Sequence, residues 1–210
     1  MDTIVPDSAA TQELLREAKA GSRQAYSRLF ARHRALLQEF VAVRLDPRLR
    51  PRIDADDIVQ ETQLEAFRGL GEFLRQRPMP FHVWLRKKAY ERLTDMRRRH
   101  VGAARRSVAR EVALPDQSSR LLAHQLVASG STPSQQLARR ELARQVRQAL
   151  AQMNDFDRDI LFMRNFEGLS YEEAASILDI DPAAARKRHG RALLRLHKLL
   201  SDDVRLERNL

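Results

Sequence analysis

Six basic residues and no acidic residue lie within residues 186–198, near the end of a chain of 210 residues. At about 100° per residue, Lys187, Arg191 and Lys198 fall on one side of a helix, opposite an apolar stripe. Arginine can bind guanine through two hydrogen bonds, and arginine and lysine both bind phosphate, so this pattern is typical of a helix that lies in a DNA groove. The alternative is an ordinary helix with a solvated basic face.

The residues before this helix favour the DNA-binding interpretation. Ser170 and Glu173 have the spacing of a capping box, which predicts a short helix over residues 171–178. Asp181 can cap the next helix, and Pro182 is well tolerated as its first residue. A short helix, a turn of three residues and a longer helix form the layout of a helix-turn-helix. The candidate DNA contacts are Arg186, Lys187, Arg188 and Arg191.

A second basic zone spans residues 86–110, with ten bases and two acids. Phe81, Trp84 and Tyr90 interleave with its first bases. Aromatic rings among cations suit single-stranded DNA, because bases stack on the rings while the cations follow the phosphates. The alternative, which we favour for Trp84, is that the rings belong to the hydrophobic core.

Carboxylates are concentrated within residues 53–73, which hold six acids and one base. Asp57 and Glu61 lie four residues apart and share one helical face. One interpretation is a metal-dependent nuclease that uses Asp54, Asp57 and Glu61. No histidine lies near these acids in the sequence, and no nucleophile or general base accompanies them. We therefore favour an acidic docking face for a protein, with Leu64 as an apolar anchor at its edge.

The elements that must position these residues are all predicted to be helices. Apolar residues recur at helical spacing, and no run of alternating strand residues is present. Caps and breakers predict helices that begin after Ser8 or Thr11, Ser22, Asp54 and Pro80. Gly, Pro and Ser then concentrate between residues 101 and 133, and the periodicity weakens apart from a short helix expected near 119–128. The expected fold is all-α, with two small helical domains over residues 1–100 and 134–210. A flexible linker over residues 101–133 joins them.

Composition excludes several classes of function. The chain has 38 Lys and Arg against 28 Asp and Glu, a net charge of +10, and no cysteine. The lack of cysteine excludes disulfides, a thiol nucleophile and thiolate metal sites. No apolar run approaches the roughly 20 residues of a membrane span, and no signal-peptide pattern is present, so we expect a cytoplasmic protein. His189 lies alone on an apolar face and is predicted to be a core residue, so no metal or cofactor is expected.

In order and spacing, these blocks resemble a bacterial RNA polymerase sigma factor of the sigma-70 family, in the extracytoplasmic-function (ECF) subfamily. The resemblance covers nearly the whole chain. The blocks that carry it are Leu29-Phe30 with His33, residues 54–62 with Ala66-Phe67, residues 84–99, residues 149–161, residues 166–175 and residues 186–192. No block is decisive alone. The opening of the last helix, Asp181-Pro-Ala-Ala-Ala, departs from the Thr-Val pair of many relatives, so the relatives' −35 sequence cannot be transferred.

The resemblance implies an alternative sigma factor, a non-enzymatic subunit that directs core RNA polymerase to promoters. Its partners would be the β′ clamp helices and β flap of the polymerase and promoter DNA, with no membrane insertion. The residues implied for the β′ clamp helices are Asp57, Gln60, Glu61 and Leu64. Those implied for the −10 element are Arg75, Arg77, Trp84, Lys87, Lys88, Arg97, Arg98 and Arg99. The last helix would read the −35 element.

Two functional questions stay open at this point. A stand-alone helix-turn-helix regulator that binds operators without polymerase is the alternative function, although it leaves the acidic face and the second basic zone without a role. Sigma factors of this class are often held inactive by an anti-sigma factor, so such a partner is a further expectation. The sequence identifies neither the residues that would bind it nor the promoter.

Overall fold

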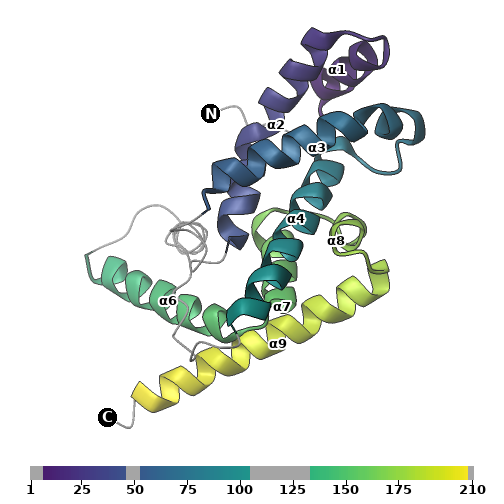
Figure 1. The fold of residues 1–210 in the computed structure, drawn as a ribbon. Coiled ribbons are helices and arrows are strands. Elements are labelled where there is room, and N and C mark those ends of the chain that lie inside the picture. The colour runs from purple at the N-terminus through teal and green to yellow at the C-terminus, as the bar shows by residue number, and fades with distance from the viewer. Residues whose placement is uncertain (1–6, 46–52, 105–132, 208–210) are drawn as a thin grey trace. The chain divides into compact units, whose positions relative to one another are not determined.

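The structure, a computed structural model, describes residues 7–45, 53–104 and 133–207. The described residues form helices and contain no strand, as the sequence predicts (Figure 1). The helices are α1 (Ala9–Lys19), α2 (Arg23–Arg44), α3 (Ala55–Gln76), α4 (Phe81–Ala104), α6 (Pro133–Gln152), α7 (Asp155–Leu161), the π-helical turn η1 (Phe162–Phe166), α8 (Tyr171–Leu178) and α9 (Pro182–Glu207).

These helices fall into two compact units. The first contains α1 to α4, and the second contains α6, α7, η1, α9 and α8 as far as Ala175. The linker expected over 101–133 lies largely outside the described residues, as does the short helix expected near 119–128. At its edges, α4 continues to Ala104 and α6 begins at Pro133.

Local capping sets the helix boundaries of the first unit. The Ser22 hydroxyl accepts a hydrogen bond from the Ala25 amide, and the Asp54 carboxylate accepts one from the Asp56 amide. Each serves an amide that has no partner within its helix. Ser8 also precedes a helix, but its hydroxyl accepts a hydrogen bond from Arg32 instead of capping α1. The predicted starts of α1, α2 and α3 are therefore confirmed, with a different role for Ser8.

An aromatic cluster lies in the core of the first unit, where α2, α3 and α4 pack together. The Phe81 ring is fully buried and meets the rings of Phe30, His33 and Phe73 edge-on. Trp84 is 8% exposed and stacks on Phe73, with the ring centroids 4.6 Å apart. Phe81 and Trp84 are thus core residues in the free protein, the alternative that the sequence favoured for Trp84.

The second unit buries its core between α6, α7, η1 and α9. Ala185 and Ala192 are fully buried on α9, which allows the helices to approach closely. At about 100° per residue, Leu193 lies beside Ala192 and His189 at the edge of the apolar stripe, but it is 41% exposed. The buried stripe of α9 is therefore narrower than the helical wheel suggests. Among the described residues, no helix is long and apolar enough to cross a membrane.

Candidate nucleic-acid and protein interfaces

The predicted helix-turn-helix is present as α8, a three-residue turn and α9. The Glu173 amide donates to the Ser170 hydroxyl at 3.1 Å, and the Ser170 amide donates to the Glu173 carboxylate at 2.7 Å, which completes the capping box. Asp179 takes the left-handed backbone conformation (φ 56°) and ends α8. Asp181 then caps α9 by accepting from the Ala184 amide at 2.8 Å. Short-range signals thus determine both helix ends at the turn.

A buried histidine fastens the two helices of this motif together. The Tyr171 hydroxyl on α8 lies 3.0 Å from Nδ1 of His189 on α9, and Nε2 of His189 lies 2.8 Å from the Asn165 side-chain oxygen. Burial, together with the nearby positive charge of Arg164, lowers the pKa of His189. A neutral ring can accept from the tyrosine and donate to the asparagine. His189 is a core residue, as the sequence predicts.

The predicted −35 contacts lie along the first turns of α9. Arg186, Lys187 and Arg191 are exposed, and Arg188 is half-buried. Two of them lie near aromatic rings: the Arg186 guanidinium is 5.0 Å from the Tyr171 ring centroid, and that of Arg188 is 5.5 Å from the Phe156 ring centroid.

These cation–π contacts limit where the two guanidinium groups point. Sequence analysis did not identify Tyr171 or Phe156 as residues that orient arginines. Their positions along the chain carry no such signal, since the contacts arise between different helices.

The predicted −10 contacts differ in their surroundings. Arg75, Arg77 and Arg99 are exposed. Lys88 is half-buried between two carboxylates, with its Nζ 3.2 Å from Glu65 and 3.3 Å from Glu91.

Burial opposes the charge of Lys88, but these carboxylates outweigh it and raise the pKa of the lysine. The ammonium group is therefore charged but already occupied in the free protein. Lys87 is half-buried as well.

The arginines at the far end of α4 divide between internal and surface contacts. A guanidinium nitrogen of Arg97 donates to the Arg44 carbonyl oxygen at 3.0 Å. Arg98 forms an ion pair with Asp95 at 2.6 Å, one turn away on the same helix. Arg97 therefore joins the end of α4 to α2, while Arg98 stays on the surface.

The predicted protein-docking residues share one exposed face of α3. Asp57, Gln60, Glu61 and Leu64 are all exposed, and Leu64 shows 52% of its surface. Glu61 forms an ion pair with Arg92 of α4. Phe67, one turn beyond Leu64, is 53% exposed and lies edge-on to Tyr26. Phe67 widens the apolar part of this face beyond the predicted set, and its three-residue spacing from Leu64 is the signal that could have identified it.

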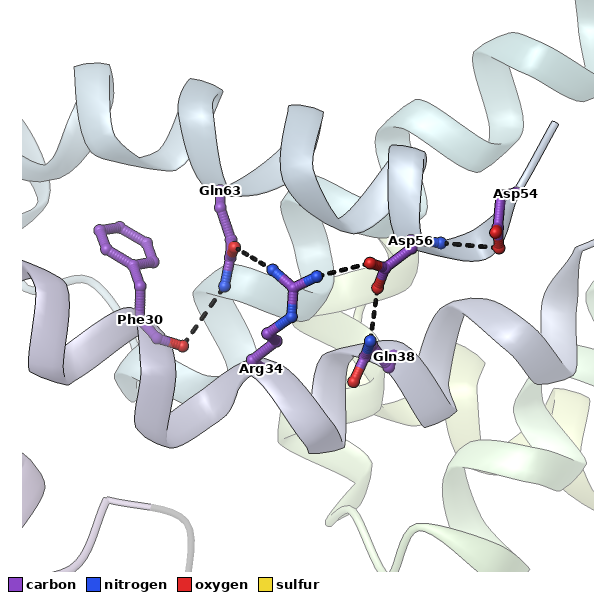
Figure 2. Close-up of polar contacts among 6 residues, drawn as sticks. All are labelled: Phe30, Arg34, Gln38, Asp54, Asp56 and Gln63. Atoms are coloured by element: carbon purple, nitrogen blue, oxygen red, sulfur yellow. Dashed lines mark hydrogen bonds and ion pairs between the residues drawn. The ribbon is translucent and has the colours of Figure 1, made fainter.

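Asp56 has a role different from that of its acidic neighbours (Figure 2). Its carboxylate accepts a hydrogen bond from Arg34 at 2.7 Å and another from Gln38, both on α2. Gln63 continues this polar line by accepting from Arg34 at 3.4 Å and donating to the Phe30 carbonyl oxygen at 3.3 Å. The network fastens α3 to α2 and so orients the exposed acidic face.

A cleft lies beside this face, between the start of α3 and the later turns of α4. Its walls carry both charges, with Asp57 and Glu61 opposite Arg92 and Arg99. Within the described ranges, no group of three or more His, Asp or Glu side chains is placed to hold a metal ion.

Two family models match the chain, one in each of its two helical units. The model described as Sigma-70 region 2 matches residues 29–102, and the model described as Sigma-70, region 4 matches residues 143–196. The first match spans most of α2, all of α3 and most of α4. The second spans the later part of α6 through the basic turns of α9.

Curated relatives match over almost the full length of the chain. RNA polymerase sigma factor CnrH of Cupriavidus metallidurans is 32% identical over 196 residues, which is 92% of this chain and 96% of that protein. RNA polymerase sigma factor NccH of Alcaligenes xylosoxydans is 30% identical over 92% of this chain and 96% of its own. The ECF RNA polymerase sigma-E factor of Haemophilus influenzae is 25% identical over 86% of this chain and 90% of that protein.

Two solved structures share the fold. CnrH in complex with the cytosolic domain of CnrY aligns with a TM-score of 0.58 at 23% identity, over 92% of this chain and 99% of that one. The sigma factor RpoE of Bartonella quintana, in complex with the anti-sigma factor NepR, aligns with a TM-score of 0.53 at 19% identity, over 85% and 96% of the two chains. These alignments support the all-α fold.

Proposed function

The chain belongs to the sigma-70 family as an ECF RNA polymerase sigma factor, and we propose that its two helical units divide promoter recognition between them. As an alternative sigma factor, it directs core RNA polymerase to specific promoters. The proposed division assigns residues 1–100 to the polymerase and the −10 element, and residues 134–210 to the −35 element, with 101–133 as the linker. Tethering both contacts to polymerase gives an avidity that neither has alone.

We assign the −35 contacts to Arg186, Lys187, Arg188 and Arg191. The observation that supports this assignment is their position on the first turns of α9, directly after the capped turn, where a recognition helix meets base edges. Arg186 and Arg188, which lie near aromatic rings, are suited to directional contacts with base edges. Lys187 and Arg191 are suited to phosphate.

We assign the −10 contacts to the segment from Arg75 to Pro80 and to α4. Arg75, Arg77 and Arg99 carry most weight, because all three are exposed, whereas Arg98, which is also exposed, is paired with Asp95. Lys87, Lys88, Arg97 and Arg98 would follow the phosphates. Trp84 contributes to base stacking only if the ring leaves Phe73, on which it now lies.

We assign core polymerase binding to Asp57, Gln60, Glu61 and Leu64, against the β′ clamp helices. The observation that carries this assignment is that all four are exposed on one face of α3, while the neighbouring Asp56 is held by α2. An acidic face with an apolar anchor suits a protein surface rather than DNA. The β flap is the expected partner of the second unit.

An anti-sigma factor is a further proposed partner. The two solved structures that share the fold are complexes, of CnrH with CnrY and of RpoE with NepR. We also propose that the chain acts in the cytoplasm, where RNA polymerase acts, and that it has no catalytic activity of its own.

In vitro transcription with core polymerase on genomic fragments tests the function, with start sites mapped. We expect discrete start sites that depend on this chain. Co-purification with core polymerase at low salt separates this function from a stand-alone regulator, and a failure to co-purify would contradict the sigma assignment.

The polymerase face is tested by reversing its charge with Asp57→Lys and Glu61→Lys. We expect at least a tenfold loss of affinity for core polymerase, because the new lysines would repel the basic surface that the acidic groups are proposed to meet. The matched control reverses Glu13 and Glu72, which are also exposed acids of the first unit. An equal loss in the control would show that total charge, rather than this face, governs binding.

A further inference from the structure

The start of α4 lacks a capping side chain of its own. The helix follows Met79 and Pro80, and neither side chain can accept a strong hydrogen bond from the first amides. The acceptor comes instead from Asp7. Its two carboxylate oxygens accept from the Phe81 amide at 2.7 Å and from the His82 amide at 3.2 Å.

Asp7 is well suited to this position electrostatically. A negative charge is stabilised by the positive end of a helix dipole. Burial opposes ionisation of this carboxyl, but the nearby His82 side chain and the hydrogen bonds from the two backbone amides outweigh it and lower the pKa of Asp7. Nδ1 of His82 lies 3.3 Å from the carboxylate. Asp7 is therefore an anionic cap supplied from 74 residues away.

The residues that follow Asp7, up to Gln12, also hold the other end of the connection between α3 and α4, which consists of residues 77–80. Arg77 ends α3 in the left-handed backbone conformation, with φ 40°, which is uncommon for a residue with a side chain. A guanidinium nitrogen of Arg77 donates to the side-chain oxygen of Gln12 on α1 at 3.3 Å. Asp7 and Gln12 thus hold both ends of residues 77–80.

Contacts with α2 anchor the segment itself. The Ser8 hydroxyl accepts from Arg32 at 3.0 Å, and the Thr11 hydroxyl lies 3.2 Å from Nε2 of His33. Thr11 and His33 are almost completely buried. Residues 7–12 therefore contact both α2 and the connection that follows α3.

We propose that residues 7–12 position the −10-binding connection, with Asp7 as the principal positioning residue. This inference rests on the proposed contact of residues 75–80 with the −10 element. A connection that is already held in place loses less conformational entropy when opened DNA binds, so complexes open more readily. Asp7 itself contacts α4 and not the DNA.

The test measures promoter opening by intact holoenzyme, using the fluorescence of 2-aminopurine placed in the −10 element. Asp7→Ala removes both acceptors, whereas Asp7→Asn keeps one acceptor and tolerates a positive φ, which Asp7 also adopts. We expect Asp7→Ala to slow the opening step about fivefold, the scale of a lost helix cap, with Asp7→Asn in between. Initial binding and core affinity should stay unchanged.

Two further variants make each outcome decisive. Glu13→Ala is the matched control, because it removes an exposed carboxylate of α1 that pairs locally, with Arg16. Arg75→Ala tests the premise, because Arg75 is an exposed candidate for the −10 contact and precedes the residues that the segment holds. If Arg75→Ala slows opening and Asp7→Ala behaves like Glu13→Ala, the positioning role is refuted while the −10 assignment stands.

If Arg75→Ala has no effect either, both assignments fail. Should Asp7→Ala unfold, the folded Asp7→Asn holoenzyme decides, since an opening rate equal to wild type overturns the proposal. A lowered melting temperature without slower opening also overturns it.

Discussion

At the scale of single residues, neighbours of the same type have different roles. Asp56 binds Arg34 and Gln38 of α2, whereas Asp57 is exposed one residue later. A helix turns by about 100° per residue, so adjacent side chains face different surroundings. An acidic segment is therefore both a structural joint and a candidate docking surface.

The buried His33 should make the first unit sensitive to acid. Burial lowers its pKa to about 4 from an ordinary value of 6.5. The charge of Asp7 opposes this shift, and the positive charges of Arg86 and Arg32 add to it. Because the unfolded chain then binds more protons, stability is full above about pH 6.5 and falls as the pH drops toward 4. At pH 5 the loss from His33 is about 2 kcal/mol.

Urea unfolding followed by the fluorescence of Trp84, the chain's single tryptophan, measures this loss in the first unit. His33→Gln should make the free energy of unfolding less dependent on pH between pH 6.5 and 5, even if the variant is less stable than wild type at neutral pH. A variant that keeps the full dependence would assign the acid sensitivity to another group.

Removing Lys187 or Arg191 tests the −35 assignment. Each alanine variant should weaken binding of the holoenzyme to duplex promoter DNA about tenfold. If each residue neutralises one phosphate, the slope of log affinity against log salt should also fall by about one. Core polymerase binding should stay unchanged.

Lys19→Ala is the matched control for this pair, because it removes the same charge from an exposed position on α1. Equal weakening by the control would indicate that only net charge matters. A simultaneous loss of polymerase binding would contradict the division between the two units.

At the scale of elements, helix ends position the candidate contacts. The capping box places the start of α8, and Asp181 places the start of α9, so the basic turns follow the motif at a set distance. Most of these signals act within four residues. The start of α4 is different, since Asp7 caps it from the other end of the unit.

Ser170→Ala should destabilise the helix-turn-helix by about 1 kcal/mol, because the Glu173 amide loses its acceptor. Faster hydrogen exchange at the first amides of α8 is the measurement. Ser201→Ala is the control, since the Ser201 hydroxyl donates within α9 to the His197 carbonyl oxygen and caps no helix start. Equal effects of the two variants would contradict the capping role.

At the scale of the whole molecule, the +10 net charge separates into regions with different roles. Bases lie on the first turns of α9 and along α4, while α3 presents acids. The proposed division gives the first unit opened DNA and polymerase, and the second unit duplex DNA. Such a division depends on both units staying in one chain.

Cutting the chain between Ala104 and Pro133 tests this dependence. A protease site inserted between them, and cleaved after purification, should lower promoter-directed transcription by about a hundredfold or more, because the effective concentration supplied by the tether is lost. The uncut chain with the same insertion should lose little, since the cost of closing a loop rises slowly with its length. Full activity after cleavage would contradict the avidity argument.

Much of the architecture could be predicted from the sequence because its signals are local. Ser22, Asp54, Ser170 and Asp181 cap the helices that they were expected to cap. Val59, Thr62 and Leu70 recur at helical spacing, and all three are buried on one face of α3. Each of these signals depends on the geometry of a single helix, and packing against other helices changes that geometry only slightly.

Other features depend on contacts between distant parts of the chain, and only the tertiary structure reveals them. The helical wheel of α9 could not show that Leu193 stays exposed, because exposure depends on which helices cover α9.

The sequence alone determined the family, the helical elements and the basic and acidic segments, because composition, spacing and caps act over a few residues. Tertiary structure decided which charges are already occupied, such as Lys88 and Arg97, and that Asp7 caps α4. The reason is physical: a hydrogen bond between residues 74 apart exists only after packing has brought them together.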